Sequence, residues 1–172
     1  MWRKYFGDQA IIYGIDVDET CRRFDAQAAQ VRIGSQDDPA FLRSVVEEMG
    51  GLDFVLDDGS HHMAHIPVSL ETLFPLLAEG GVYMIEDLHT AYWRGWGGGY
   101  GSSRNFFRYV DEIISDMHRW YHKRKMVHAG ISDLCSGVHV HDSIVVLDKG
   151  STYKPVHSQI GTHPAAVQLE DA

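Results

Sequence analysis

Two short apolar runs that each end abruptly in acidic residues constrain the fold of this chain most strongly. Residues 52–62 have the sequence LDFVLDDGSHH, and residues 82–93 have the sequence VYMIEDLHTAYW. Neither apolar run alternates with polar residues, which is typical of parallel strands that helices cover on both faces. Functional side chains in such sheets gather at the carboxyl ends of the strands. The sequence therefore predicts an α/β fold with its chemistry at the tips of these two strands.

The rest of the chain alternates between strand-like and helix-like segments. Pro39 near the start and Gly50 at the end mark the clearest helix. A segment rich in glycine and aromatic residues, 89–104, predicts a lid or substrate loop. Residues 151–172 show little periodicity, so we predict one catalytic domain over 1–150 and a loose tail over 151–172. We expect further strands at 10–18, 30–33 and in a hairpin at about 137–141 and 143–148, and helices at 1–7, 20–29, 39–50, 66–81 and 106–125.

The net charge and the apolar content argue against some binding partners and some cellular locations. The chain has 15 basic and 24 acidic residues and a formal net charge of −9, which repels nucleic acid and anionic lipid. It has no apolar run of 18 residues and no signal-peptide pattern at residues 1–9. We therefore expect a cytoplasmic protein without nucleic-acid or membrane partners, and the sequence leaves a homo-oligomer open. The two thiols, Cys21 and Cys135, lack a metal-type spacing, so we expect them to be reduced and unpaired.

Four carboxylates follow the two acidic strands: Asp57 and Asp58 after one, and Glu86 and Asp87 after the other. Buried carboxylates cost several kcal/mol unless they are paired or bind a cation. If the two strands are neighbours, about 4.8 Å apart, their acidic tips can share one ion. Oxygen ligands without cysteine favour Mg²⁺, Mn²⁺ or Ca²⁺ over Zn²⁺.

His61, three residues after Asp58, is the candidate general base, because an imidazole changes protonation near neutral pH. The plainer interpretation is a histidine that caps a helix. His61 and His65 are spaced for zinc in a helix, but Pro67 argues against a regular helix across both. Asp58, His61 and His89 also match a two-histidine, one-carboxylate Fe(II) site for oxygen chemistry, and this alternative stays open.

Two polar turns are candidates for cofactor binding. Asp16 ends the predicted strand 10–18, where an acid in a nucleoside-binding sheet accepts hydrogen bonds from ribose hydroxyls, although an acid there also simply ends a strand. Ser35, Gln36 and Asp37 end the strand at 30–33. They are placed to contact an adenine edge, and they equally suit a polar turn before Pro39.

Three blocks carry a resemblance: DDGSHHMAH at 57–65, LFPLLAEGGVYMIEDLHTAYW at 73–93 and VHVHDSIVVLDKG at 138–150. Over residues 1 to about 150 the chain resembles the S-adenosylmethionine-dependent, metal-dependent sugar O-methyltransferases of the mycinamicin type, from macrolide and polyketide antibiotic biosynthesis. The resemblance implies a Rossmann-like class I methyltransferase sheet. It also implies methyl transfer to a sugar or small-molecule hydroxyl, with a glycosylated natural product as the acceptor.

The resemblance also implies roles for individual residues. Asp58, Glu86 and Asp87 would bind Mg²⁺, and His61 would be the base. The cofactor S-adenosylmethionine would have its ribose on Asp16 and its adenine beside the turn at 34–38, so that Ser35, Gln36, Asp37 and Asp57 count as cofactor-binding. The aromatic side chains Tyr92, Trp93 and Trp96 would form an apolar wall for the acceptor, or would pack the loop on the sheet.

The resemblance is incomplete at its start. A class I methyltransferase, with strand order 3-2-1-4-5-7-6, has a first strand and a glycine-rich loop before the helix that corresponds to MWRKYF. Neither precedes that helix in this sequence, and the glycines at 97–99 follow a different strand. We therefore expect the sheet to lack its central first strand. On that basis the chain is a piece of a longer enzyme or an inactive methyltransferase fragment.

Overall fold

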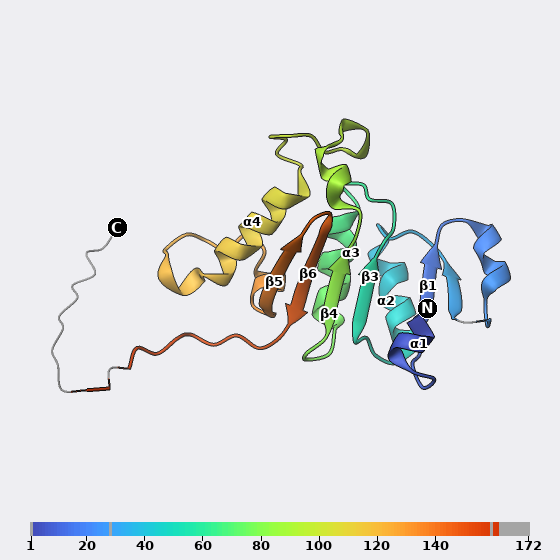
Figure 1. The fold of residues 1–172 in the computed structure, drawn as a ribbon, viewed down its shortest axis with the longest axis horizontal. Helices are drawn as coiled ribbons and strands as arrows, with labels where there is room; N and C mark the ends of the chain where they lie inside the picture. The colour runs from blue at the N-terminus through green and yellow to red at the C-terminus, as the bar shows by residue number, and fades with distance from the viewer. Residues whose placement is uncertain (1, 28, 159, 162–172) are drawn as a thin grey trace.

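The structure is a computed structural model that describes residues 2–27, 29–158 and 160–161 (Figure 1). Its strands are β1 (Tyr13–Asp16), β2 (Gln30–Ile33), β3 (Phe54–Asp57), β4 (Val82–Ile85), β5 (Cys135–His141) and β6 (Ile144–Lys149). Its α-helices are α1 (Trp2–Phe6), α2 (Pro39–Met49), α3 (Ile66–Leu73), α4 (Phe106–Met117) and α5 (Ala129–Ser132). Strands and helices alternate over most of the chain, which confirms the predicted α/β class.

The main sheet has the strand order β3-β4-β6-β5. β3 and β4 are parallel and pair Phe54 with Val82 and Asp57 with Ile85. β6 is antiparallel to both of its neighbours, β4 and β5, as the predicted C-terminal hairpin requires. Because β3 and β4 end opposite one another, the residues that follow Asp57 and Ile85 meet at the same edge of the sheet.

β1 and β2 form a separate parallel pair, which pairs Tyr13 with Gln30 and Asp16 with Ile33. Figure 1 draws β1 between β2 and β3, yet no strand pairing joins β1 to β3 among the described residues. None of the residues in β1 or β2 is buried. The facing edges of β1 and β3 are therefore unpaired in the described part of the chain. That a further strand belongs between them stays a prediction.

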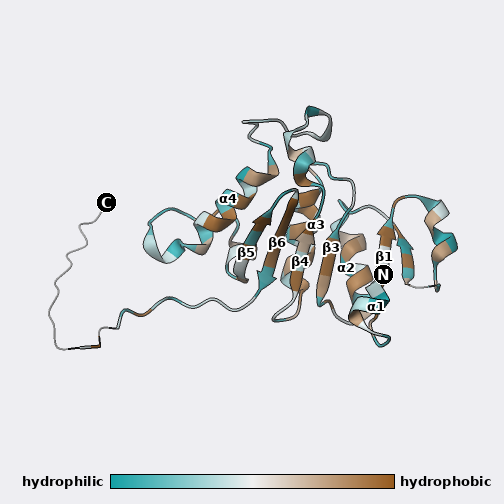
Figure 2. Ribbon diagram, viewed as in Figure 1, coloured by the Kyte–Doolittle hydropathy of each residue, from teal (hydrophilic) through white to brown (hydrophobic). Residues whose placement is uncertain are grey.

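The hydrophobic core lies between the main sheet and the helices that follow it in the chain. Figure 2 shows hydrophobic residues concentrated on the strands of the main sheet and on α3. Every buried member of the core comes from residues 42–147, so the β1–β2 pair contributes none of them. The largest fully buried side chains are Leu42, Ile66, Leu70, Phe74, Tyr83, Ile85, Leu88, Phe106, Ile113, Ile131, Val145 and Leu147.

The residues predicted at the ends of α1 and α2 are confirmed. The side chain of Asp38 accepts hydrogen bonds from the backbone N–H groups of Ala40 and Phe41 at the start of α2. Gly50 ends α2 in the left-handed conformation at φ 80°, which glycine adopts without strain. Gly7 ends α1 in the same way at φ 88°.

Several element boundaries differ from the sequence-based expectation. The helix expected over 106–125 ends at Met117. The His118 ring hydrogen-bonds the Ile114 carbonyl oxygen, and the Ser115 carbonyl oxygen is bonded by the His122 ring as well as by the His118 backbone N–H. The helix expected over 66–81 is α-helical only as α3, to Leu73, and continues as a 3₁₀ turn, η2 (Phe74–Leu76), around Pro75. The helix expected over 20–29 is a 3₁₀ turn, η1 (Glu19–Phe24), and the strand expected over 10–18 shortens to β1.

His128 lies in largely enclosed surroundings between α4 and α5. Its side chain is 11% exposed. The ring lies 4.0 Å from the ring of Tyr109, and Nε2 lies 2.9 Å from Glu112 Oε2. Helix α5, which follows His128 directly, was not predicted, because its four residues are too few to show a helical period.

The expected tail at 151–172 falls largely outside the described residues. Within 151–158 the backbone has no regular structure, although Ser151 N–H donates to Glu79 Oε1 and the Thr152 hydroxyl accepts from Arg119 Nη2. No helix in the described ranges is both long and apolar enough to span a membrane.

Lys149, at the end of β6, ties the sheet to the end of α3 and should stabilise the fold. The residue is 7% exposed, and its Nζ donates to the carbonyl oxygens of Phe74 at 3.2 Å and Pro75 at 2.9 Å. Burial lowers the pKa of Lys149. We expect Lys149→Met to lower the free energy of unfolding by about 1–3 kcal/mol, because the Pro75 carbonyl loses the Lys149 donor and the Phe74 carbonyl keeps only the Leu77 N–H. Urea unfolding measures this, with exposed Lys154→Met as the matched control. Equal midpoints for the two variants would contradict it.

Candidate active site

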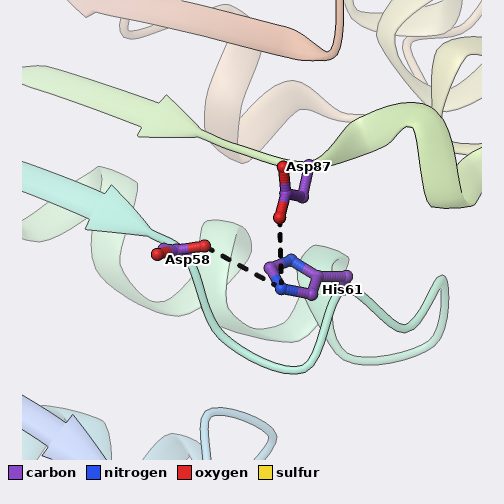
Figure 3. Close-up of side chains that lie close together, drawn as sticks. All are labelled: Asp58, His61 and Asp87. Carbon is purple, nitrogen blue, oxygen red and sulfur yellow. Dashed lines mark ion pairs between the residues drawn. The ribbon is translucent and has the colours of Figure 1, made fainter.

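The carboxyl ends of β3 and β4 bring Asp58, His61 and Asp87 together (Figure 3). His61 Nε2 lies 3.8 Å from Asp58 Oδ1 and 3.8 Å from Asp87 Oδ2. One nitrogen or oxygen atom of each side chain lies within 4.8 Å of the others. The imidazole is 22% exposed, whereas the two carboxylates are about half exposed. The group is therefore reachable from solvent, with the histidine between two acids.

The backbone at two of these residues adopts an uncommon conformation. His61 has φ 54° and Asp87 has φ 55°, both in the left-handed region that residues other than glycine seldom adopt. The Thr90 hydroxyl lies 3.1 Å from the His61 carbonyl oxygen and 2.9 Å from that of Asp87. Thr90 is 3% exposed and joins the two strained residues from one buried position. The sequence analysis did not single out Thr90. Its one signal is its position three residues after Asp87.

The ligand atoms of this group suit a hard divalent cation. The two carboxylates supply the oxygen ligands that Mg²⁺ and Mn²⁺ prefer, and the group has no sulfur, whereas an imidazole nitrogen is more typical of Zn²⁺ or Fe²⁺. Glu86, which the sequence analysis placed among the metal ligands, is not a member of the group. It is half-buried, and its backbone N–H donates to the Asp57 carbonyl oxygen at 3.0 Å. The structure thus brings together two of the three expected acidic ligands and adds the histidine.

The second histidine of each of the two other metal hypotheses, His89 for iron and His65 for zinc, lies outside this group. His89 Nδ1 is 2.8 Å from Ser143 Oγ and 3.8 Å from Asp87 Oδ1, and His89 does not join Asp58 and His61 in one set of ligand atoms. His65 Nδ1 is 2.9 Å from Ser60 Oγ. The geometry therefore favours neither the iron site with His89 nor the zinc site with His65.

Asp57 is buried, and its carboxylate is fully engaged by neighbours. Oδ2 accepts hydrogen bonds from the hydroxyls of Ser69 and Tyr83, the latter at 2.8 Å, and Oδ1 accepts from Gln36 Nε2 at 3.0 Å. Burial and the Asp57 charge raise the pKa of Tyr83 well above its ordinary value, so the phenol stays a donor. These three donors offset the cost of burying the carboxylate. In this conformation Asp57 has a structural environment, although the sequence analysis counted it with the cofactor-binding residues.

The other expected cofactor residues lie at the ends of β1 and β2. Asp16 is exposed, and its Oδ1 accepts from the backbone N–H of Asp18 at 2.8 Å. A hydrogen bond with Asp16 is the main cause that raises the pKa of Cys21. Ser35 donates to Asp37, and this bond lowers the pKa of Asp37, with His65 lowering it further. The structure places Asp16 with a carboxylate open to solvent, whereas Gln36 and Asp37 face the loop that follows β3.

Aromatic rings extend from the acidic group along the segment that follows β4, through η3 (Leu88–Tyr92) and η4 (Arg94–Trp96). The ring of Trp93 lies 4.8 Å from the ring of His89 and 5.3 Å from that of Trp96. The indoles of Trp93 and Trp96 are 48% and 38% exposed, while Tyr92 stacks on Phe107 at 5.7 Å. The two tryptophans thus offer apolar surface beside the site, and Tyr92 packs the segment onto α4.

Comparisons with known proteins point to one group of enzymes. The chain is 38% identical over 155 residues to an 8-demethyl-8-(2-methoxy-α-L-rhamnosyl)-tetracenomycin-C 3′-O-methyltransferase of Streptomyces olivaceus, a match that covers 87% of this chain and 39% of that protein. It is 42% identical over 122 residues to an L-olivosyl-oleandolide 3-O-methyltransferase of Streptomyces antibioticus, covering 69% of this chain and 31% of that protein. No family model matches the sequence.

The fold agrees with these relatives. A solved structure of the MycE methyltransferase from the mycinamycin pathway, in complex with Mg, SAH and mycinamycin VI, superposes with a TM-score of 0.77 and 29% identity, over 87% of this chain and 39% of that chain. The chain thus spans about two-fifths of the length of the relatives that it matches. By sequence and by fold it belongs to the class I methyltransferase family that includes the sugar O-methyltransferases of macrolide and polyketide antibiotic pathways.

Proposed function

We propose that this chain is the catalytic part of an enzyme that transfers a methyl group from S-adenosylmethionine to a sugar hydroxyl of a glycosylated natural product. The observation that carries the proposal is the group formed by Asp58, His61 and Asp87 at the carboxyl ends of β3 and β4. Relatives whose sequences align with most of this chain are named as sugar O-methyltransferases, and the similar MycE structure holds Mg and SAH. A metal-assisted O-methyl transfer accounts for both findings.

The residues of the group suit this reaction. Asp58 and Asp87 are the residues that would hold Mg²⁺, with Glu86 as a further acidic neighbour. The bound ion would lower the pKa of the acceptor hydroxyl. His61 Nε2 faces both carboxylates and is placed to accept the hydroxyl proton. The acceptor oxygen then forms a bond to the methyl carbon as the sulfur–carbon bond breaks, and S-adenosylhomocysteine leaves.

The remaining candidates divide between the cofactor and the acceptor. Asp16, at the tip of β1, has an exposed carboxylate that would accept hydrogen bonds from ribose hydroxyls. The turn formed by Ser35, Gln36 and Asp37 follows β2 on the same side, and its backbone would border the adenine. Trp93 and Trp96 would contact the apolar part of the acceptor. Each of these roles is a proposal that rests on position.

Metal binding gives the direct test. Mn²⁺ titration followed by electron paramagnetic resonance should show one site, and EDTA should abolish methyl transfer. We expect Asp58→Asn to weaken Mn²⁺ binding by at least about tenfold, since even residues that only support metal ligands contribute that much. Asp53→Asn is the matched control, because Asp53 is exposed and precedes β3 at its opposite end. Full methyl transfer in EDTA, or tight iron binding with oxygen consumption, would contradict the proposal.

A further inference from the structure

Gln36 joins the turn after β2 to the loop that carries the candidate catalytic residues. Its Nε2 donates to Asp57 Oδ1 at 3.0 Å and lies 3.3 Å from Ser69 Oγ. Its Oε1 accepts from the backbone N–H of Ser60 at 2.5 Å. Both ends of the amide are therefore committed to β3 and the loop that follows it. An adenine edge could take this side chain only by breaking these bonds.

The chain leaves space for this contact at Gly59. A Cβ atom at that position would lie 2.3 Å from Gln36 Oε1, closer than nonbonded atoms can approach. A side chain there would push the Gln36 amide away from Ser60. The contact between Gln36 and Ser60 therefore depends on glycine at residue 59.

A second route connects the same turn to Ser60. The Ser60 hydroxyl oxygen accepts from the His62 backbone N–H at 3.3 Å and lies 2.9 Å from His65 Nδ1. His65 Nε2 lies 3.6 Å from Asp37 Oδ2. Ser60 is thus held at its backbone by Gln36 and at its hydroxyl by His65.

Ser60 is the point at which this contact acts on the site. It stands between Asp58 and His61 in sequence, in a segment without helix or strand structure. His61 follows it in the left-handed conformation. The direction in which His61 points therefore depends on where Ser60 is fixed.

We propose that Gln36 and His65 are positioning residues that hold the loop 58–61 through Ser60 and so set the geometry of Asp58 and His61. The effect on the metal rests on the proposed function, whereas the hold on Ser60 does not. The β1–β2 pair, which shares no strand pairing with the main sheet in the described chain, would thereby act on the site through side chains alone.

Two measurements on the full chain test this proposal. Gln36→Met keeps the length of the side chain and removes both hydrogen-bonding ends. We expect the Ser60 amide proton to exchange at least about tenfold faster in the metal-free chain, because its acceptor is lost. We expect Mn²⁺ to bind on the order of tenfold more weakly, as for other residues that support metal ligands. His65→Phe removes the second route and should change both quantities in the same direction by less.

Two control variants separate positioning from general destabilisation. Tyr83→Phe removes a donor to Asp57 but does not touch Gln36 or Ser60, so it should lower thermal stability without changing Ser60 exchange or Mn²⁺ affinity. Gln9→Met makes the same change as Gln36→Met at an exposed position and should change nothing.

The outcomes distinguish the two proposals. Unchanged Ser60 exchange in Gln36→Met would overturn the hold on Ser60, and equal losses of Mn²⁺ affinity in Gln36→Met and Tyr83→Phe would overturn the positioning role. Absence of Mn²⁺ binding by the unsubstituted chain would instead overturn the proposed function, and the Ser60 exchange rates would still decide whether Gln36 holds the loop.

Discussion

Methyl transfer should fall by roughly 10²- to 10⁴-fold when His61 is replaced by alanine, the usual effect of losing a general base. The reason is geometric: His61 Nε2 faces Asp58 and Asp87 at 3.8 Å from each, where an acceptor hydroxyl held by a shared cation would present its proton. Initial rates with labelled S-adenosylmethionine, at saturating Mg²⁺ and acceptor, measure the effect in an enzyme that includes the predicted first strand.

The adjacent histidine supplies the matched control for this prediction. His62 Nδ1 accepts from the Ala64 backbone N–H, and the His62 ring lines a separate cavity of about 330 Å³ that none of Asp58, His61 and Asp87 lines. His62→Ala should therefore affect the rate much less. A larger loss in His62→Ala than in His61→Ala would show that the base has been assigned to the wrong residue.

Mn²⁺ affinity distinguishes two roles for His61. If His61 acts only as a base, the affinity of His61→Ala should stay close to that of the unsubstituted chain. The structure supports a second role, which the sequence raised only for iron or zinc, because His61 Nε2 belongs to the group of atoms that could hold the ion. A loss of affinity comparable with that of Asp58→Asn would make His61 a ligand.

The sequence predicted the elements that have strong local signals. Apolar runs of four residues fixed β3 and β4, and an N-cap, an early proline and a C-terminal glycine fixed α2. The end of α4 was missed, where the rings of His118 and His122 bond backbone carbonyls of the last turn. Local periodicity carries no information about such side-chain capping.

The candidate site could likewise be predicted only where the signal was local. Parallel pairing of β3 with β4 was sufficient to bring Asp58 close to Asp87, because acids at the ends of neighbouring parallel strands meet. The partners of Asp57 could not be predicted. Gln36 reaches it from 21 residues before and Tyr83 from 26 residues after, and contacts at such separations leave no periodic signal in a sequence. Whether a buried acid serves a ligand or the fold depends on these distant partners.

The unpaired edges of β1 and β3 lead to the other large expected effect, which concerns association. An exposed strand edge presents unpaired N–H and C=O groups that pair readily with another chain. β1 also exposes apolar side chains, with Ile15 38% exposed and Val17, just after the strand, 69% exposed. Each unpaired backbone group that becomes buried costs on the order of 1–3 kcal/mol, so a few such groups rival the 5–15 kcal/mol stability of a domain. We therefore expect the 172-residue chain to self-associate at micromolar concentration, or to fail to bind S-adenosylmethionine.

Sedimentation velocity and calorimetry with S-adenosylmethionine measure these two outcomes, and two charge substitutions locate the contact. Ile15→Lys places a charge on the edge strand β1, which discourages edge-to-edge pairing, and should shift the chain toward monomer. Val140→Lys makes a comparable change on β5, the opposite edge strand, where Val140 is 52% exposed. It should leave association unchanged, because β5 does not face the gap between β1 and β3. A stable monomer that binds the cofactor with micromolar affinity would contradict this prediction. It would show that the unpaired edges of β1 and β3 need no further strand.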